Sequence, residues 1–95
     1  MIKVGWSARK NRLNILKHRI DFEEAKTVFD DPNQATINDP DHSLQEERYI
    51  TIGRSTQGRL IIMAHTFEDA KIRIISARKP TRTEREKYEE GNFDA

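Results

Sequence analysis

The pattern of apolar residues along the chain changes about one third of the way from its start. Before residue 35 the apolar positions recur at spacings of three or four, and after it they alternate with polar positions. A period near 3.6 is typical of a helix with one apolar face, and a period of 2 is typical of a strand. The sequence therefore predicts helices first and strands afterwards.

The helical part is preceded by a short alternating segment, which predicts a strand at 2–6. Ser7 then stands where the N-cap of a helix is expected, and a basic helix follows at about 8–18. Leu13 and Leu16 form a narrow apolar stripe on this helix, and basic residues occupy the rest of its surface.

A second helix is predicted to begin at Asp21. Asp21 and Glu24 have the spacing of a capping box, in which each side chain binds a backbone N–H of the other residue. Phe22 and Phe29 fall on one face of this helix. Pro32 ends it, because the residue before a proline avoids the helical region.

The strand-like part predicts four strands, at 35–39, 47–55, 59–67 and 71–79. A polar loop at 40–45 separates the first from the others, and the short links between the last three predict antiparallel hairpins. A final helix is predicted to start after Pro80 and to run to about Glu90, where Gly91 stops it. Two residue pairs have capping-box spacing, Thr81 with Glu84 and Thr83 with Glu86, so its first residue is left open.

The turn that contains Gly58 predicts a register for the sheet. If Gly58 is left-handed in a three-residue loop, Thr51 faces Met63. One face then consists of apolar residues: Ile50, Ile52, Leu60, Ile62, Ala64, Ile72 and Ile74. The opposite face carries Tyr49, Thr51, Ile61, Met63, His65, Arg73 and Ile75.

Three residues of that opposite face are the first candidates for chemistry. Tyr49, His65 and Arg73 are predicted to lie in one cross-strand row. A histidine exchanges protons near neutral pH, and an arginine can stabilise the charge of a phosphate during reaction. The alternative is that His65 is a hydrogen-bonded structural residue of the sheet.

A basic cluster follows the last strand. Arg78 and Lys79 leave that strand and Arg82 opens the next helix, whose N-terminus favours phosphate. The alternative is a set of surface charges that pair with nearby glutamates. We assign catalysis to Tyr49, His65, Arg73 and Arg78, and substrate binding to Arg54, Lys79 and Arg82.

Composition limits the class of protein. The 95 residues are 35% hydrophobic and 35% charged, which favours one small α+β domain over 1–95. The absence of cysteine excludes disulfides and thiolate metal sites. The three histidines show no ligand spacing, and no apolar run is long enough for a membrane span. We expect a cytoplasmic protein without metal, cofactor or membrane contact.

The net charge of +1 conceals separate charged blocks. The first 20 residues contain six Lys or Arg and no acid, and residues 21–47 contain nine Asp or Glu and one Lys. Residues 48–82 are again basic, and residues 83–95 are acidic. Such blocks either cancel as solvated faces or gather into a surface that attracts phosphate.

Several runs in the chain resemble the BrnT toxin family in order and spacing, from about Trp6 to Glu90. The runs are KH at 17–18, FEEA at 22–25, VFDDP at 28–32, EER at 46–48, IG at 52–53, GR at 58–59, HT at 65–66 and IRIISARK at 72–79. Three residues depart from the usual family pattern: Ser7 replaces aspartate, Arg19 replaces glycine and Pro80 replaces alanine.

The resemblance implies a RelE-like fold and a ribonuclease that halts translation. It also implies neutralisation by a DNA-binding BrnA-type antitoxin of the ribbon-helix-helix class, through which any contact with operator DNA is made. RNA cleavage needs no metal if the neighbouring 2′-hydroxyl attacks the phosphate. The alternative is a non-catalytic module of the same fold that binds RNA or protein.

The antitoxin is expected to cover the basic face. It would present acidic residues to Arg73, Arg78 and Arg82, and apolar side chains to the sheet. Those apolar contacts are predicted at Ile61, Met63 and Ile75.

Overall fold

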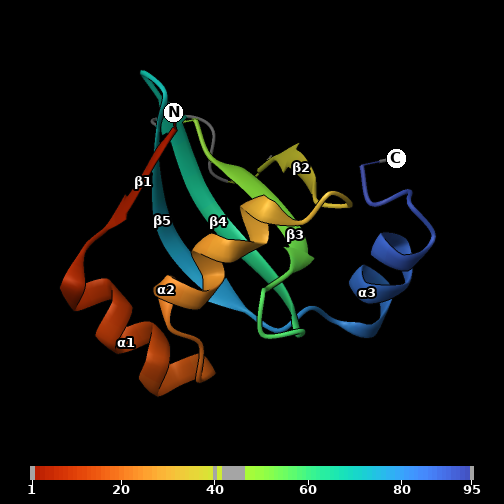
Figure 1. The fold of residues 1–95 in the computed structure, drawn as a ribbon, viewed down its shortest axis with the longest axis horizontal. Coiled ribbons are helices and arrows are strands. Elements are labelled where there is room, and N and C mark those ends of the chain that lie inside the picture. The colour runs from red at the N-terminus through yellow and green to blue at the C-terminus, as the bar shows by residue number, and fades with distance from the viewer. Residues whose placement is uncertain (1, 40, 42–46, 95) are drawn as a thin grey trace.

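The computed structural model describes residues 2–39, 41 and 47–94. Within these residues, five strands form one sheet in the order β1-β5-β4-β3-β2, and three α-helices and one 3-10 helix pack around it (Figure 1). The polar loop predicted at 40–45 lies outside the described residues, apart from Asp41.

The elements follow the predicted order of one strand, two helices, four strands and one helix. They are β1 (Lys3–Trp6), α1 (Ala8–His18), α2 (Phe22–Ala25), the 3-10 helix η1 (Lys26–Asp30), β2 (Ala35–Asn38), β3 (Tyr49–Arg54), β4 (Leu60–Glu68), β5 (Lys71–Arg78) and α3 (Arg82–Glu89). The sheet is mixed, because β1 pairs with β5 in parallel and the other neighbours are antiparallel. The α+β class is confirmed.

The helix starts follow from their caps. The backbone N–H of Lys10 donates to the Ser7 hydroxyl, and that of Glu23 donates to the Asp21 carboxylate. At α3 the open choice is settled in favour of Thr81 and Glu84, which form a complete capping box. These caps bind backbone donors that a helix leaves without partners.

The second helix differs from the prediction in two ways. After Ala25 it continues as the 3-10 helix η1. The Thr27 hydroxyl donates there to the Glu24 carbonyl and so competes with the backbone N–H groups for that acceptor. The capping box with Asp21 does not form, because the Glu24 carboxylate is bound elsewhere. It accepts hydrogen bonds from Arg59 at 2.6 and 2.8 Å and from Ser55 at 2.7 Å.

Arg59 also explains how the chain turns between α1 and α2. Arg19 adopts a left-handed conformation there, with φ of 59°, at the position where glycine is usual. The Arg59 guanidinium donates to the Arg19 carbonyl at 3.0 Å while it holds Glu24. Its hydrogen bonds keep the pKa of the buried Glu24 carboxyl below the ordinary value. One side chain thus fixes both ends of the turn.

The predicted register is confirmed for β3 with β4 but is wrong for β4 with β5. Thr51 pairs with Met63, and Gly58 is left-handed with φ of 91°. Beyond Ala64 a β-bulge shifts the pairing, so that His65 faces Ile74. Ile72 and Ile74 therefore share a face with Met63 and His65 and not, as predicted, with Ile50 and Ile62.

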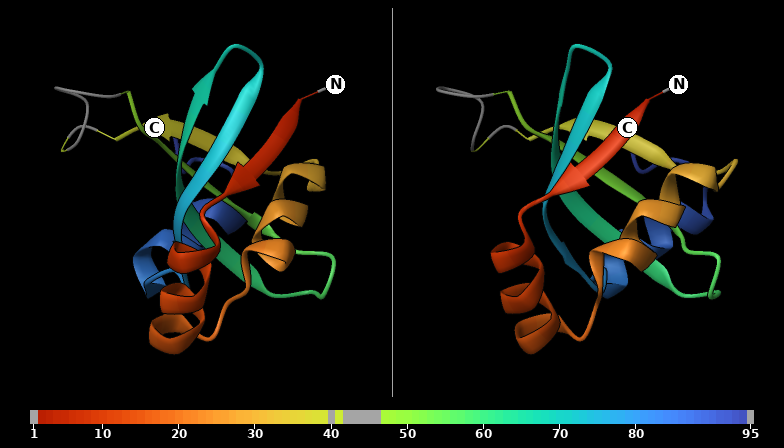
Figure 2. Two further views of the ribbon diagram at one scale, coloured as in Figure 1. Left: turned by 90° about the vertical axis from the view of Figure 1, so that its left-hand side faces the viewer. Right: turned by 60° about the vertical axis from the view of Figure 1, so that its left-hand side comes forward.

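Both faces of the sheet are covered, by different elements (Figure 2). The face under α2 and η1, which we name the α2 face, contributes Ile61, Met63, Ile74 and Ala77 to the main core with Ile20, Phe22, Ala25 and Val28. The other face, which we name the α3 face, packs Ile52, Leu60 and Ile62 against Phe93 and Tyr88. The face predicted to carry the first candidates for chemistry therefore forms the main core.

η1 lies close against the sheet at Gly53. A Cβ added there would lie 2.7 Å from Cγ1 of Val28, which is buried in the core. We expect Gly53→Ala to lower the free energy of unfolding by about 1–3 kcal/mol, since overpacking forces the backbone to move. Urea denaturation measures this change.

Gly5→Ala is the matched control, because a Cβ at Gly5 meets no atom within 4 Å. It should leave the free energy of unfolding unchanged or raise it slightly. Equal losses in the two variants would show that strand flexibility, and not the contact with Val28, is responsible.

Candidate functional site

His65 lies in the core and not at a surface. Its side chain is 3% exposed, and its ring packs edge-on against Phe29 and parallel to Tyr49. The Nε2 atom is 2.7 Å from the Thr51 hydroxyl, and Nδ1 is 3.0 Å from the Thr66 carbonyl. Both ring nitrogens are therefore occupied by the protein.

These contacts fix the tautomer of His65. A carbonyl oxygen only accepts, so the hydrogen bond to Thr66 places the proton on Nδ1. In the neutral ring Nε2 then accepts from the Thr51 hydroxyl, which in turn accepts from the Thr36 hydroxyl at 2.7 Å. Burial lowers the pKa of His65, and the bond to Thr66 offsets this only in part. The structure favours the alternative of a structural histidine.

Tyr49 is opposite His65, as predicted, but points its hydroxyl elsewhere. The hydroxyl donates to a carboxylate oxygen of Glu47 at 3.0 Å. That hydrogen bond raises the pKa of Tyr49 above its ordinary value, so the phenol stays protonated at neutral pH.

Arg73 does not complete the predicted row. The bulge pairs it with Thr66, and its other neighbour in the sheet is Gly5. Side chains alternate between faces along a strand, so Arg73 lies on the α3 face while His65 lies on the α2 face. The cross-strand row of Tyr49, His65 and Arg73 is therefore wrong in its third member.

Arg78 lies on the α3 face near the start of α3. Its guanidinium forms two hydrogen bonds to the Glu84 carboxylate, at 2.9 and 3.0 Å, and Glu84 also accepts from the Thr81 N–H. This pairing raises the pKa of Arg78 and lowers that of Glu84. Arg78 is thus held in place by the same carboxylate that caps α3.

A cleft of about 320 Å³ opens on the α3 face beside Arg78. It is lined by Asp39, Arg48, Ile50, Ile62, Met63, Ala64, Ile75, Ser76 and Arg78. Ala64 and Ser76 are paired across β4 and β5, and their small side chains leave room between Arg48 and Arg78. Two arginines beside these small residues are suited to bind an anion with several oxygens, such as a phosphodiester.

Two residues of this cleft were missed by the sequence interpretation. Asp39 is 6% exposed, and its backbone N–H donates to the Arg48 carbonyl, so the two residues are neighbours. The alternation of β3 already indicated that Arg48 shares a face with Ile50. A charged residue at the end of an apolar row was the available signal.

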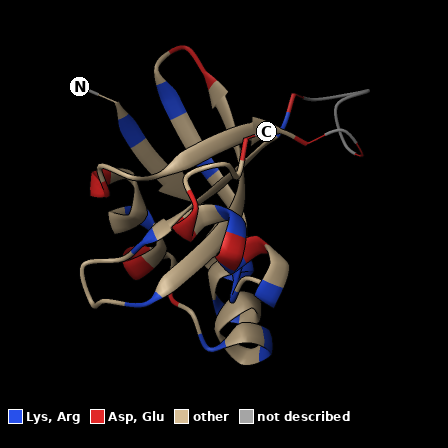
Figure 3. Ribbon diagram, turned by 90° about the vertical axis from the view of Figure 1, so that its right-hand side faces the viewer, with Lys and Arg blue, Asp and Glu red and all other residues tan. Residues whose placement is uncertain are grey.

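The three residues predicted to bind substrate do not line this cleft. Lys79 is exposed just after β5, and Arg82 pairs with Glu86 at 3.0 Å on the outside of α3. Arg54 lies at the far end of β3, where its guanidinium is 6.0 Å from the Tyr88 ring. Basic and acidic residues lie side by side on α3 (Figure 3), so the helix has no single strong charge.

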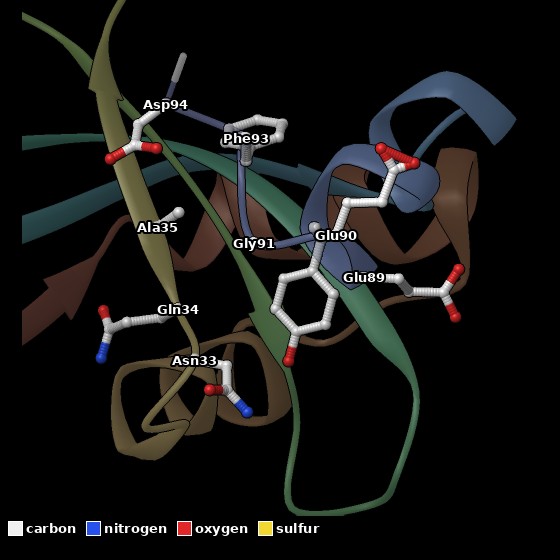
Figure 4. Close-up of a pocket in the computed structure, with 9 residues that line it drawn as sticks. Asn33, Gln34, Ala35, Glu89, Glu90, Gly91, Phe93 and Asp94 are labelled. Carbon is white, nitrogen blue, oxygen red and sulfur yellow. The ribbon is translucent and has the colours of Figure 1, made fainter.

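A second pocket, of about 470 Å³, lies between the start of β2 and the end of α3 (Figure 4). Glu89, Glu90 and Asp94 line it, together with Asn33 and Gln34. This lining is acidic and would repel a phosphate, so the pocket does not fit a nucleic acid.

Two residues predicted as contacts for a partner are buried inside the protein. Ile61 is 0% exposed and Met63 is 2% exposed, because α2 and η1 cover the face that carries them. Ile75, the third, is half-buried at the cleft. The prediction of Ile61 and Met63 as apolar contacts for an antitoxin is therefore wrong.

Over the described part of the chain, no helix combines the length and apolar character that crossing a membrane requires. Over the same residues, His, Asp and Glu side chains form no group of three that could hold a metal ion.

Comparison with known proteins identifies a family. A family model described as the ribonuclease toxin BrnT of a type II toxin–antitoxin system matches residues 6–84. The structure is similar to that of the Brucella abortus ribonuclease toxin BrnT, with a TM-score of 0.62 at 20% identity, over 86% of this chain and 100% of that chain. At this identity the similarity shows a shared fold. Among curated proteins, no sequence match was found.

The buried His65 predicts how stability depends on pH. Its lowered pKa means that the folded protein binds a proton less readily than the unfolded chain does. The free energy of unfolding should hold steady above the unfolded pKa of about 6.5 and fall as the pH drops below it. Urea denaturation at each pH measures this fall.

His65→Gln should reduce the fall and also lower stability at neutral pH, because it removes the group that takes up the proton. Glu24 and Glu84 also have shifted pKa values, but because these are lowered, the two groups change stability only below about pH 4.5. They therefore do not interfere with the measurement of His65. An unchanged fall in the His65 variant would contradict this interpretation.

Proposed function

Because this chain belongs to the BrnT family of ribonuclease toxins of type II toxin–antitoxin systems, we propose that it cleaves RNA in the cleft of the α3 face. The observation that carries the proposal is the pair of arginines, Arg48 and Arg78, on either side of the small residues Ala64 and Ser76. A phosphodiester placed there would meet a guanidinium on two sides.

The proposed reaction uses the RNA's own nucleophile and no metal. The 2′-oxygen forms a bond to the adjacent phosphorus, and the bond from phosphorus to the 5′-oxygen breaks. Arg48 and Arg78 stabilise the extra negative charge on the phosphorane oxygens, which is the largest contribution that fixed donors make to such reactions. The products are a 2′,3′-cyclic phosphate and a 5′-hydroxyl.

Two proton transfers accompany these bond changes. Among the described residues that line the cleft, Asp39 has the carboxylate that can take the proton of the 2′-hydroxyl. Water supplies the proton that the leaving 5′-oxygen takes up. Arg73, on the same face, is proposed to contact a neighbouring phosphate.

The assignment changes for the residues on the other face. Tyr49 and His65 lie on the α2 face of the sheet, whereas Arg78 lies on the α3 face. Both nitrogens of His65 are hydrogen-bonded within the protein. We therefore propose that they hold β3 and β4 together and do not contact the RNA. Lys79, Arg82 and Arg54 would attract RNA only through their charge.

Cleavage of RNA by this site would halt translation in the cytoplasm, and a BrnA-type antitoxin of the ribbon-helix-helix class would suppress it. We further propose that the fold is related to that of RelE-like toxins. These proposals extend the family assignment, and the halt of translation depends on the catalytic test below.

Arg78→Gln should lower the rate of RNA cleavage by about 100-fold or more, as loss of one charged donor does at other sites of this kind. The assay uses the purified chain, a short RNA and EDTA, and it identifies the product ends. Glu84→Gln is the matched control, because it breaks the same ion pair but keeps the guanidinium. Because Glu84 also holds Arg78 in place, this variant should lose some cleavage, but much less than Arg78→Gln does.

Equal losses in the two variants would show that Arg78 serves only to hold α3. Cleavage that stops in EDTA and returns with Mg²⁺ would overturn the metal-free mechanism. RNA that binds the wild type and is never cut would identify a non-catalytic module.

Asp39→Asn should lower the cleavage rate and leave RNA affinity nearly unchanged, because a proton acceptor contributes mainly to the transition state. Asp41→Asn is the control, since Asp41 is exposed and its N–H donates to Asp39. The measurement is the rate at saturating RNA together with a binding titration. Full activity of Asp39→Asn would assign the proton transfer to another group.

A further inference from the structure

The first helix is packed in an unusual orientation. Leucines are expected to face a core, yet Leu13 is 52% exposed and Leu16 is 72% exposed. The polar residue Asn14 is buried instead, and Asn11 is half-buried beside it. The apolar stripe predicted on this helix therefore faces solvent.

Two asparagines account for this orientation. The Asn14 amide donates to the Ile20 carbonyl at 2.9 Å, and its oxygen accepts from the Ala77 N–H at 3.0 Å. Asn11 accepts from the Phe22 N–H at 2.9 Å. These bonds satisfy backbone groups next to α2 and at the edge of β5, which would otherwise be buried without partners. The helix is held by its polar side, so its leucines are left outside.

The exposed leucines form one patch. Residues three apart on a helix are neighbours on its surface, so Leu13 and Leu16 are adjacent. Isolated exposed apolar residues are common on proteins and need no explanation. Here, however, two of the largest exposed apolar side chains of the described chain lie together on one helix of 11 residues.

The patch is surrounded by positive charge. Arg9, Lys10, Arg12 and Lys17 are exposed on the same helix, and the first 20 residues contain no acid. None of these four side chains takes part in the ion pairs that form among the described residues. Basic residues in the first turn also oppose the helix dipole, and carboxylates placed nearby would relieve that repulsion.

We infer that the outward face of α1, made by Leu13, Leu16 and the four basic residues around them, is the docking surface for an acidic, amphipathic segment of the antitoxin. The inference rests on the proposed function for the identity of the partner. Complementary charge selects an acidic segment, and the two leucines require apolar side chains on it. RNA would use the cations but would leave the leucines without a role.

The location of α1 connects this surface with the proposed site. Asn14 is hydrogen-bonded to Ala77, the residue before Arg78, so α1 is attached to the strand that carries the arginine. A partner seated on α1 is therefore held at the edge of β5, next to the cleft. Leu13 and Leu16 therefore replace Ile61 and Met63, which are buried, as the expected apolar contacts for the antitoxin.

The experiment measures binding of a BrnA-type antitoxin to immobilised variants of this chain. Leu13→Gln with Leu16→Gln should weaken the affinity by about 10-fold or more for each leucine, mainly through faster dissociation. Arg9→Glu with Arg12→Glu should slow association and reduce its dependence on salt. Thermal unfolding of each variant should match the wild type, since all four side chains are exposed.

Phe67→Gln is the matched control, because Phe67 is 46% exposed but lies on β4, away from α1. It should bind as the wild type does. Unchanged binding by the leucine variant, or no binding by the wild type, overturns the inference. So does sedimentation showing that the leucines join two copies of this chain without antitoxin.

RNA cleavage without antitoxin is measured on the same variants. The leucine variant should cleave RNA at the wild-type rate. If it loses cleavage or RNA affinity while antitoxin binding persists, α1 is an RNA surface and the inference is wrong. If the wild type binds antitoxin through α1 but cuts no RNA, the proposed function fails and the docking surface stands.

Discussion

One extra residue in β5 determines which of its side chains meet the core and which meet solvent. Ile75 has no partner in β4, because the pairing steps from Ser76 with Ala64 to Ile74 with His65. In a regular strand Arg73 and Arg78, five positions apart, would lie on opposite faces. The bulge brings both arginines to the α3 face and places Ile72 and Ile74 on the α2 face. A regular strand would instead force a guanidinium into the main core.

The same bulge separates two kinds of polar group that the chain carries close together in sequence. On the α2 face, hydrogen bonds run from the Thr36 hydroxyl through Thr51 and His65 to the Thr66 carbonyl, and such a chain makes strand pairing specific. On the α3 face, Arg78 is bound to Glu84 on its outer side and borders the cleft on its inner side. The polar groups named on the first face hold the structure, and Arg78 on the second borders the cleft in which we propose that RNA binds.

Much of the fold could be predicted from local chemistry, whereas the site could not. Ser7, Asp21 and Thr81 mark helix starts because a cap acts within one turn, and Gly58 fixes the β3–β4 register because its turn allows one geometry. The bulge has neither glycine nor proline to mark it, and only the adjacent pair Ile74 and Ile75 breaks the alternation. The outward leucines of α1 depend on backbone groups far away in sequence, which no local pattern records. Arg48 and Asp39 meet across a loop.

The parallel pairing of β1 with β5 affects the order in which the molecule can be completed. A ribosome makes β1 before β5, so their hydrogen bonds wait until all the elements between the two strands have been made. Pairing β1 with β5 closes a long loop, and such contacts form late. The edge of β5 that receives Asn14 is finished at the same stage. Until then neither the two-sided sheet nor the fixed orientation of α1 exists. A nascent chain thus lacks both the arginine cleft and the surface by which the finished protein would be recognised.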